Sequence, residues 1–541
     1  MSTAHTVFDT FAEVARRQPE ADFLHTEAHT AQAYGIEPCT MTCGDALTRI
    51  EALRDRYAAA GYGFGHRAGL LLENRPDFFL NWFALNALGV SVVPINADLR
   101  SAELRYLVEH SEMCVAVCLP ERVADLQAAS QNGLVVIAPD DFSALTSAAS
   151  PAKHGVLSRD TECALLYTSG TTGRPKGCVL SNDYFLLAGE WYARIGGLCN
   201  LRKGEERLIT PLPLSHMNAM AYSAMAMVVT GGCLIQLDRF HPRTWWQSVR
   251  ASGATVVHYL GVMPAMLLGA PPSVDDRKHR VRFGFGAGVD KRQHEAFEAR
   301  FGFPLLEAWA MTETGAGAVV IANHEPRLVG VASFGRAEAA VDVRLVMESG
   351  NEAAVDEPGE LWVRAASEGH AHPRKGFFTE YLKDPEATAQ AWEHGWFHTG
   401  DLVRHDAQGN LYFVDRKKNV IRRSGENISA VEVESVLAQH PRVKAVAVAA
   451  TPDEVRGDEV LACVVLHEAA SGDASTLATE ITQLALDQLA YYKAPGFVAF
   501  VDELPLTVSQ KIQRAQLKLL AAGLPGQSRC IDTRHLKRRQ T

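Results

Sequence analysis

The 541-residue sequence lacks the features that would place it in a membrane. It contains no apolar run approaching about 18 residues, the length that a membrane-spanning helix needs. Its first residues, MSTAHTVFDTFAEVARRQPEADFL, have the pattern of an amphipathic helix and lack the apolar core of a signal peptide. We therefore expect a cytoplasmic protein with no integral membrane association.

Metal-binding cysteine patterns and an excess of positive charge are also missing. The ten cysteines include no CxxC pair and no His/Cys cluster with zinc spacing, which favours reduced, mostly buried thiols. The net charge of −10 argues against nucleic acid as an obligatory partner, because proteins that bind duplexes usually present a basic face. A local basic patch could still bind a nucleotide.

The length and the apolar pattern predict a layered α/β protein of two or more domains. A chain of this size is too long for one compact core, and its 47% hydrophobic and 21% charged residues are typical of globular proteins. Up to about Asp160, short apolar strands alternate with helices. The strands are expected at Gly69–Glu73, Val92–Pro94 and Cys114–Leu119, and a helix within Asn74–Asn86.

The stretch Leu165–Gly177, LLYTSGTTGRPKG, has the composition of a phosphate-binding loop. Gly170 and Gly173 permit positive φ, so that backbone N–H groups can turn toward an anion, and Lys176 adds a positive charge. It is not a Walker A motif, because Pro175 precedes the lysine and Gly177 follows it. Hydroxyl donors come from Thr168, Ser169, Thr171 and Thr172. This density of donors suits a triphosphate.

Further motifs follow in order along the chain. A second glycine-rich stretch, GFGAGVD, follows a strand but is no dinucleotide fingerprint, because Val289 occupies the place of the third glycine. The carboxylate of Asp401, in WFHTGD, suits two vicinal ribose hydroxyls. The remaining segments are PLPLSHMNAM at Pro211–Met220, LEAWAMTETG at Leu306–Gly315, the charged run from Asp415 to Lys418, GENISAVEVE at 425–434 and LPLTVSQKIQRAQL at Leu504–Leu517.

Together these motifs resemble those of the adenylate-forming superfamily, which comprises acyl- and aryl-CoA synthetases, luciferases and peptide-synthetase adenylation domains. The resemblance spans about Ala164 to Leu517, and GENISAVEVE is similar to the corresponding segment of acyl-CoA ligases of the carnitine/crotonobetaine and fatty-acid type. It implies an α/β fold with a large multi-subdomain N-terminal domain of layered sheets and helices, residues 1–417, and a small mobile α+β C-terminal domain, residues 418–541.

The resemblance also implies roles for individual residues. The phosphate loop would bind ATP, Trp309 would stack on adenine, and Thr312 and Thr168 would meet the phosphates. Glu313 would hold Mg²⁺ and Lys511 would be the catalytic lysine, whereas Ala310 replaces the family's usual glycine. Other implied contacts are the adenine loop Gly286, Ala287 and Gly288, the ribose partners Asp401 and Arg416, the coenzyme A channel at Gly425, and the acyl pocket at His216, Asn218, His258 and Gly261.

The implied reaction has two steps. A carboxylate attacks the α-phosphate of MgATP to give an acyl-adenylate and pyrophosphate, and the thiol of coenzyme A then displaces AMP. The polar groups of His216, Asn218 and His258 favour a small polar, dicarboxylic or aromatic acid, because burying unpaired polar groups costs about 1–3 kcal/mol each.

Other functions share these motifs. The alternatives are an adenylation enzyme that loads a carrier protein, a luciferase-like oxygenase and a non-enzymatic nucleotide-binding homologue. The last is weakened because both Glu313 and Lys511 are present, and we expect a stand-alone ligase because no carrier domain follows Thr541. The sequence allows a homodimer but does not identify the acid.

Overall fold

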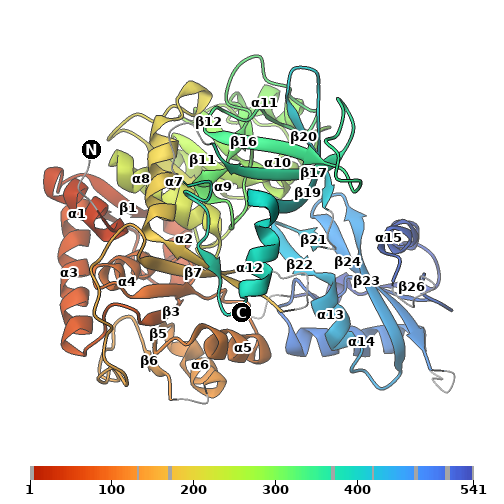
Figure 1. The fold of residues 1–541 in the computed structure, drawn as a ribbon, viewed down its shortest axis with the longest axis horizontal. Helices are drawn as coiled ribbons and strands as arrows, with labels where there is room; N and C mark the ends of the chain where they lie inside the picture. The colour runs from red at the N-terminus through yellow and green to blue at the C-terminus, as the bar shows by residue number, and fades with distance from the viewer. Residues whose placement is uncertain are drawn as a thin grey trace. The chain divides into compact units, whose positions relative to one another are not determined.

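A computed structural model describes residues 5–130, 133–168, 174–366, 372–416, 420–467, 473–505 and 512–538. This part of the chain forms two compact units (Figure 1). Unit 1 comprises Met1–Ala97, Val108–Leu166 and Gly177–Asp415. Unit 2 comprises Asp98–Leu107, Tyr167–Lys176 and Arg416–Thr541.

The first sheet of unit 1 is mainly parallel. Strands β1, β10, β9, β11, β12 and β13 run in the same direction, and the edge strands β2 and β14 are antiparallel to their neighbours. Parallel strands bring the loops after their carboxyl ends to one edge, where ligands of open α/β sheets bind. The strand order is β14 (Val320–Ile321), β13 (Leu305–Trp309), β12 (Phe283–Ala287), β11 (Val256–Leu260), β9 (Arg207–Thr210), β10 (Cys233–Gln236), β1 (Asp22–Thr26) and β2 (Cys39–Thr42).

The second sheet contains the strands predicted in the N-terminal part of the chain. Its order is β18 (Glu380–Tyr381), β8 (Lys176–Ser181), β7 (Glu162–Thr168), β4 (Ser91–Pro94), β3 (Arg67–Leu71), β5 (Val115–Cys118) and β6 (Val135–Ile137). The strands expected near Gly69, Val92 and Cys114 are confirmed to within about two residues. The pattern of Gln127–Lys153 did not predict strand β6.

The helices follow local signals in the sequence. At the start of α1, Thr6 accepts from the N–H of Asp9 and the Asp9 carboxylate accepts from the N–H of Thr6, which is a capping box. Pro76 stands at the beginning of α4, and every residue from Phe78 to Asn86 is buried, so α4 is an interior helix. The helices outside residues 430–523 are α1 (Val7–Arg17), α2 (Ala28–Tyr34), α3 (Cys43–Ala59), α4 (Pro76–Asn86), α5 (Ser101–Ser111), α6 (Val123–Ala129), α7 (Asn182–Arg194), α8 (Met225–Thr230), α9 (Trp245–Ala251), α10 (Val262–Leu268), α11 (His294–Phe301) and α12 (Pro385–Ala391).

The third sheet of unit 1 is antiparallel where its pairing is described. Its order is β15 (Ser333–Gly335), β20 (Leu411–Arg416), β19 (Phe397–His405), β17 (Gly359–Ala365) and β16 (Val341–Val346). Strand β19 carries Asp401, and the pairing of β17 with β19 is irregular between Glu360 and Trp362.

Unit 2 packs α13 (Ala430–Leu437), α14 (Ala474–Gln488) and α15 (Arg514–Gly523) with a mixed sheet. The sheet order is β22 (Glu426–Ser429), β21 (Val420–Arg423), β24 (Gly457–Leu466), β25 (Phe497–Phe500) and β26 (Cys530–Asp532), and β23 (Val443–Asp453) also pairs with β24. The pattern from Ser429 to Glu432 predicts a capping box at the start of α13. Ser429 does cap the helix, but the carboxylate of Glu432 bonds Lys493 at 2.8 Å instead of completing the box.

The predicted fold class is confirmed. The chain combines a large α/β part of layered sheets and helices with a smaller α+β part near its C-terminus (Figure 1). Within the described ranges, no helix is long and apolar enough to cross a membrane.

Candidate active site

Trp309 and Asp401 come from different sheets of unit 1 and meet. Trp309 ends β13, and its Nε1–H donates to Oδ2 of Asp401 on β19 over 2.9 Å. Both side chains are nearly inaccessible, at 7% and 1% exposure. The ring of Phe334 stacks on Trp309 with centroids 6.3 Å apart. The residues predicted to contact adenine and ribose are therefore brought together, and their orientation is fixed by this hydrogen bond.

Glu313 lies in the loop that follows β13 and is held from two sides. The hydroxyl of Tyr381 donates to Oε1 of Glu313 over 2.9 Å, and the N–H of Phe378 donates to the Glu313 carbonyl over 2.9 Å. Next to it, the carbonyl of Thr312 accepts from the hydroxyl of Tyr184 on α7 over 2.8 Å. Only 7% of Glu313 is exposed. The loop predicted to bind metal and phosphate thus has a defined conformation.

Tyr381 was not identified from the sequence. It lies on β18, opposite Cys178 of β8, which is the strand that follows the phosphate loop. Burial raises the pKa of Tyr381, and the charge of Glu313 raises it further, so the phenol keeps its proton and remains a donor. The pairing of two strands distant in sequence creates this contact, so no local pattern indicates it.

Glu307 is a second residue that sequence reasoning missed. Its carboxylate accepts from the N–H groups of Gly288 and Val289 at 2.9 and 3.3 Å and from the Tyr259 hydroxyl at 2.8 Å. Glu307 is 8% exposed, and burial raises its pKa while the bond from Tyr259 opposes the rise. The only local signal was a carboxylate inside the apolar strand LLEAW. This residue fixes the loop predicted to pack against adenine.

Gly261 has a packing role next to the same loop. Its N–H donates to the carbonyl of Ala287 over 2.9 Å, and a Cβ at this position would lie 1.6 Å from the carbonyl oxygen of Gly288. Glycine is required because two backbone segments approach each other here. Gly286 and Ala287 end β12, and Gly288 has a φ of 82°.

His258 differs from the expectation that it lines an acyl pocket. It is fully buried, with Nδ1 2.7 Å from Ser223 Oγ and 3.0 Å from Asn218 Oδ1, and Nε2 3.1 Å from the Tyr192 hydroxyl. Because Oδ1 of Asn218 can only accept, Nδ1 carries the proton and Nε2 accepts from Tyr192. Burial lowers the pKa of His258 to about 3, so the ring is neutral. Its hydrogen-bonding capacity is used within the protein.

Asn218 and His216 are only partly buried. Asn218 begins a π-helix, Asn218–Ala224, which continues into α8. Short π-helical segments are rare in proteins overall, and those that occur often lie at functional sites. The roles of Asn218 and His216 in binding the acid remain predictions.

The phosphate loop is described only at its ends. Thr168 ends β7 and Lys176 begins β8, whereas Ser169, Gly170, Thr171, Thr172 and Gly173 lie outside the described residues. Just before Lys176, the carbonyl of Pro175 accepts from the hydroxyl of Tyr106 over 2.8 Å. The guanidinium carbon of Arg174 lies 5.4 Å from the centroid of the Tyr106 ring.

The remaining predicted residues belong to unit 2. Arg416 ends β20, and Lys511 lies outside the described residues. Gly425 has a φ of 90° and follows Ser424 with a φ of 51°, and Arg423 pairs with Glu426 across them. Two consecutive residues with positive φ form the type I′ turn that connects tight hairpins. Gly425 therefore has a conformational reason to be glycine.

Comparison with known proteins gives a consistent result. Residues 11–368 match the model of the AMP-binding enzyme family, and residues 432–511 match that of the AMP-binding enzyme C-terminal domain. A crotonobetaine/carnitine–CoA ligase from Shigella sonnei (strain Ss046) is 32% identical over 87% of this chain and 91% of its own length.

Solved structures of two CoA synthetases or ligases are similar to this chain. An o-succinylbenzoate CoA synthetase from Bacillus subtilis, bound to a product analogue, has a TM-score of 0.78 and 25% identity, covering 94% of this chain and 98% of its own. A malonyl-CoA ligase in complex with methylmalonyl-CoA and AMP has a TM-score of 0.73 and 26% identity, covering 90% and 97%.

Proposed function

Because the chain belongs to the AMP-binding enzyme family of the adenylate-forming superfamily, we propose that it is an ATP-dependent carboxylate–CoA ligase. The proposed reaction joins the acid to AMP with release of pyrophosphate and then transfers the acyl group to coenzyme A with release of AMP. The observation that carries the proposal is the bonded pair Trp309 and Asp401, followed within four residues of Trp309 by the buried Glu313.

In the proposed adenylation step a negatively charged carboxylate attacks the negatively charged triphosphate of ATP, and the residues of the site have roles that suit this reaction. No nucleophilic side chain is needed, and the protein's task is to orient the phosphates and compensate their charge. We assign charge compensation to Lys176 and Lys511 and donation of hydrogen bonds to the phosphate loop. Trp309 and Asp401 would bind the adenosine part of ATP.

Glu313 fits the Mg²⁺ that the family resemblance implies. Among the described residues no group of three or more His, Cys, Asp or Glu could hold a metal by itself. Mg²⁺ usually binds one or two protein carboxylates together with substrate phosphates, and Glu313 offers an oxygen ligand held in place by Tyr381. When bound, the ion supplies positive charge against the phosphate oxygens.

A small polar, dicarboxylic or aromatic acid is the proposed substrate. Three of the similar proteins are named for small groups, namely crotonobetaine and carnitine, o-succinylbenzoate, and malonyl. Asn218 and His216, which are partly buried, are the polar residues that we expect to contact the acid. His258 is instead engaged by Asn218, Ser223 and Tyr192.

Coenzyme A is favoured over a carrier protein as the acceptor. The three similar proteins described above are named as CoA ligases or synthetases. A cytoplasmic location and a homodimer stay predictions.

Acid-dependent exchange of pyrophosphate into ATP tests the adenylation step directly. The panel should contain carnitine, crotonobetaine, malonate, o-succinylbenzoate, benzoate and palmitate. We expect exchange with at least one small acid and then an acyl-CoA product when coenzyme A is added. Absence of exchange with every acid by protein that binds ATP would contradict the ligase assignment, and faster turnover of palmitate than of all small acids would contradict the proposed substrate class. Exchange without any thioester product would favour the carrier-loading alternative.

A further inference from the structure

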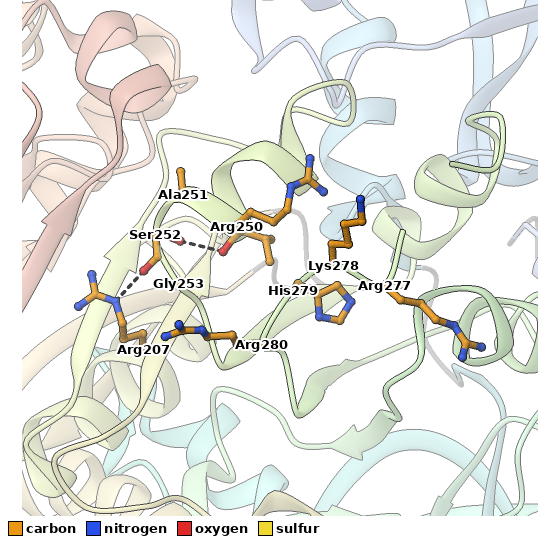
Figure 2. Close-up of a pocket in the computed structure, with 10 residues that line it drawn as sticks. Arg207, Arg250, Ala251, Ser252, Gly253, Arg277, Lys278, His279 and Arg280 are labelled. Carbon is orange, nitrogen blue, oxygen red and sulfur yellow. Dashed lines mark hydrogen bonds between the residues drawn. The ribbon is translucent and has the colours of Figure 1, made fainter. Parts of the chain in front are cut away.

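A basic pocket opens at the edge of the first sheet opposite the candidate site. Arg207 begins β9, residues 250–253 lie at the end of α9 before β11, and residues 277–280 precede β12. The pocket has a volume of about 750 Å³ and is shown in Figure 2. Trp309 is the last residue of β13 and Gly288 follows β12, so both lie at the carboxyl ends of their strands. This pocket, at the amino ends of β9 and β12, is therefore a separate site.

Positive charge dominates the lining. The charged and titratable side chains that line it are Arg207, Arg250, Arg277, Lys278, Arg280 and His279, and no aspartate or glutamate is among the lining residues. Asp22 and Asp275 lie next to it and pair with Arg207 and Lys278, each at 2.6 Å. In the part of the chain that the structure describes, Arg250, Arg277 and Arg280 form no ion pair with a carboxylate, although the charge of Arg250 helps to lower the pKa of Asp275 and Asp276. The net charge of the whole protein is −10.

Part of the lining has a structural role. Nε of Arg207 donates to the Ser252 carbonyl at the end of α9 over 2.6 Å, and Nε of Arg277 donates to the Arg300 carbonyl near the end of α11 over 3.3 Å. Basic side chains commonly satisfy the last carbonyls of helices in this way. These bonds shape the walls of the pocket.

His279 lines the pocket with an uncharged imidazole ring. Its Nδ1 accepts from the N–H of Val281 over 3.2 Å, so Nε2 carries the proton that it donates to the Phe301 carbonyl over 3.0 Å. The imidazole stacks on Trp246 with centroids 5.3 Å apart and an interplanar angle of 15°. Burial lowers the pKa of His279, in agreement with the neutral form.

Arg250 and Arg280 have no comparable structural role. Arg250 makes one long hydrogen bond of 3.5 Å to the Asp275 carbonyl, and Arg280 makes no hydrogen bond or ion pair with any other described residue. In Figure 2 the side chain of Arg280 extends toward Arg207. One exposed arginine needs no ligand, but several positive charges around one concavity create a positive potential that attracts an anion.

We infer that this pocket binds a small phosphorylated compound with two or more negative charges. A planar guanidinium such as that of Arg250 or Arg280 can donate two parallel hydrogen bonds to phosphate oxygens, and the volume lies in the range of small-molecule sites. A nucleic acid or an anionic membrane requires a broad basic face, whereas these basic residues line a pocket of a protein with a net charge of −10. The site would let a phosphorylated compound bind without occupying the candidate active site.

Hydrogen exchange on the full chain, with inorganic pyrophosphate as the probe and without the carboxylic acid, tests this inference. We expect pyrophosphate to slow amide hydrogen exchange in segments 249–254 and 276–282, which contain residues that line the pocket. This effect should be separate from any change at 286–289 or 310–314, which belong to the candidate active site. The dissociation constant for pyrophosphate at this pocket can be measured from the protection of these two segments, and is here called the local dissociation constant. In the double variant Arg250→Ala/Arg280→Ala it should rise at least about tenfold, because each charge-assisted bond contributes more than a neutral one. Arg280→Lys should bind more weakly than the wild type, since lysine keeps the charge and loses the planar fork.

Arg243→Ala is the matched control, because Arg243 is an exposed arginine just before α9 that is outside the pocket lining. It should leave the local dissociation constant unchanged, and acid-dependent pyrophosphate exchange should be normal in all these variants. The inference is overturned if pyrophosphate protects neither segment, if NaCl of equal ionic strength protects them equally, or if protection persists in the double variant. Protection by a polyglutamate peptide but not by pyrophosphate would also overturn it, and would indicate an acidic protein partner.

Discussion

The hydroxyl of Tyr381 donates a hydrogen bond of 2.9 Å to Glu313, the proposed Mg²⁺ ligand. These residues are 68 positions apart and meet because β18 pairs with β8 beside the loop that follows β13. Glu313 is 7% exposed, so this bond helps to stabilise a carboxylate that has little contact with water. Tyr381 is therefore a positioning residue that acts through Glu313.

Tyr381→Phe should weaken the response to Mg²⁺. Losing a hydrogen bond to a charged group costs about 1.5–3 kcal/mol, so we expect the Mg²⁺ concentration for half-maximal adenylation to rise about tenfold or more. Glu313→Gln should have the larger effect, because a neutral amide is a poor ligand for a hard cation. The measurement is a Mg²⁺ titration of pyrophosphate exchange at saturating ATP.

Tyr412→Phe is the matched control for this prediction. The Tyr412 hydroxyl also donates to a carboxylate, Oδ2 of Asp406 at 2.8 Å, but neither residue belongs to the candidate site. Its Mg²⁺ titration should be that of the wild type. An unchanged titration for Tyr381→Phe would remove the positioning role, and equal shifts for both variants would attribute the effect to general destabilisation.

Glu307→Gln should selectively impair binding of the nucleotide. The carboxylate holds the N–H groups of Gly288 and Val289, and an amide keeps one acceptor oxygen while placing an NH₂ donor against backbone donors. We expect the KM for ATP to rise about three- to tenfold while kcat changes less. Equilibrium binding of AMP checks this result without turnover, and a loss of kcat at constant AMP affinity would contradict it.

The sequence predicts elements whose signals are local. Pro76 marks the start of α4, Ser429 caps α13, and both helices begin where these residues indicate. The motifs around Trp309 and Asp401 also indicate a shared nucleotide site, and the structure brings these two residues into contact. For the two helices the physical cause lies within a few residues of the pattern, whereas Trp309 and Asp401 are 92 positions apart and only the family resemblance of their motifs assigned them to one site.

Contacts between distant segments are what the sequence does not predict. Tyr381 and Glu307 acquire their roles from strand pairing and from the path of another loop. The position of His258 shows the same limit. The family resemblance implies that His258 lines the acyl pocket, yet the side chain is fully buried and Ser223, Asn218 and Tyr192 use both of its nitrogens.

The stability of unit 1 should depend on pH through Glu298. Burial opposes ionisation, but hydrogen bonds from Arg327, His294 and the Leu305 N–H prevail and lower the pKa of Glu298 to about 2 from a usual value of 4.5. A lowered pKa stabilises the folded state above about pH 4.5, and this contribution is lost as the pH falls toward 2.

Glu298→Gln should therefore lower the free energy of unfolding by about 2 kcal/mol at pH 7, and the difference from the wild type should shrink between pH 5 and pH 3. Urea unfolding across this range measures it. Glu480→Gln is the control, because its nearest basic atoms lie 3.8 Å away on a half-exposed surface. A difference independent of pH would contradict the role of the Glu298 charge.

Lys511→Ala should separate the two proposed half-reactions. The lysine would compensate charge only while the α-phosphate is attacked, so we expect adenylation to fall about 100-fold or more and thioester formation from supplied acyl-adenylate to change little. Pyrophosphate release and acyl-CoA formation are followed separately. Lys518→Ala, a change at a lysine in α15, serves as the control and should leave both rates intact. Equal loss of both half-reactions in Lys511→Ala would contradict this role.

Gly425→Leu should block the second half-reaction. We propose that one arrangement of the two domains serves adenylation, another serves thioester formation, and that the turn at Gly425 faces the coenzyme A channel in the second. Gly425 has a φ of 90°, so any side chain there adds backbone strain of about 1–3 kcal/mol.

Gly425→Ala is the matched control, since it carries the same strain with little added volume. We expect equal thermal destabilisation of both variants and near-normal pyrophosphate release, but loss of acyl-CoA formation in the leucine variant alone. Normal thioester formation by Gly425→Leu would remove Gly425 from the channel, whereas equal loss in both variants would attribute the effect to the strained turn.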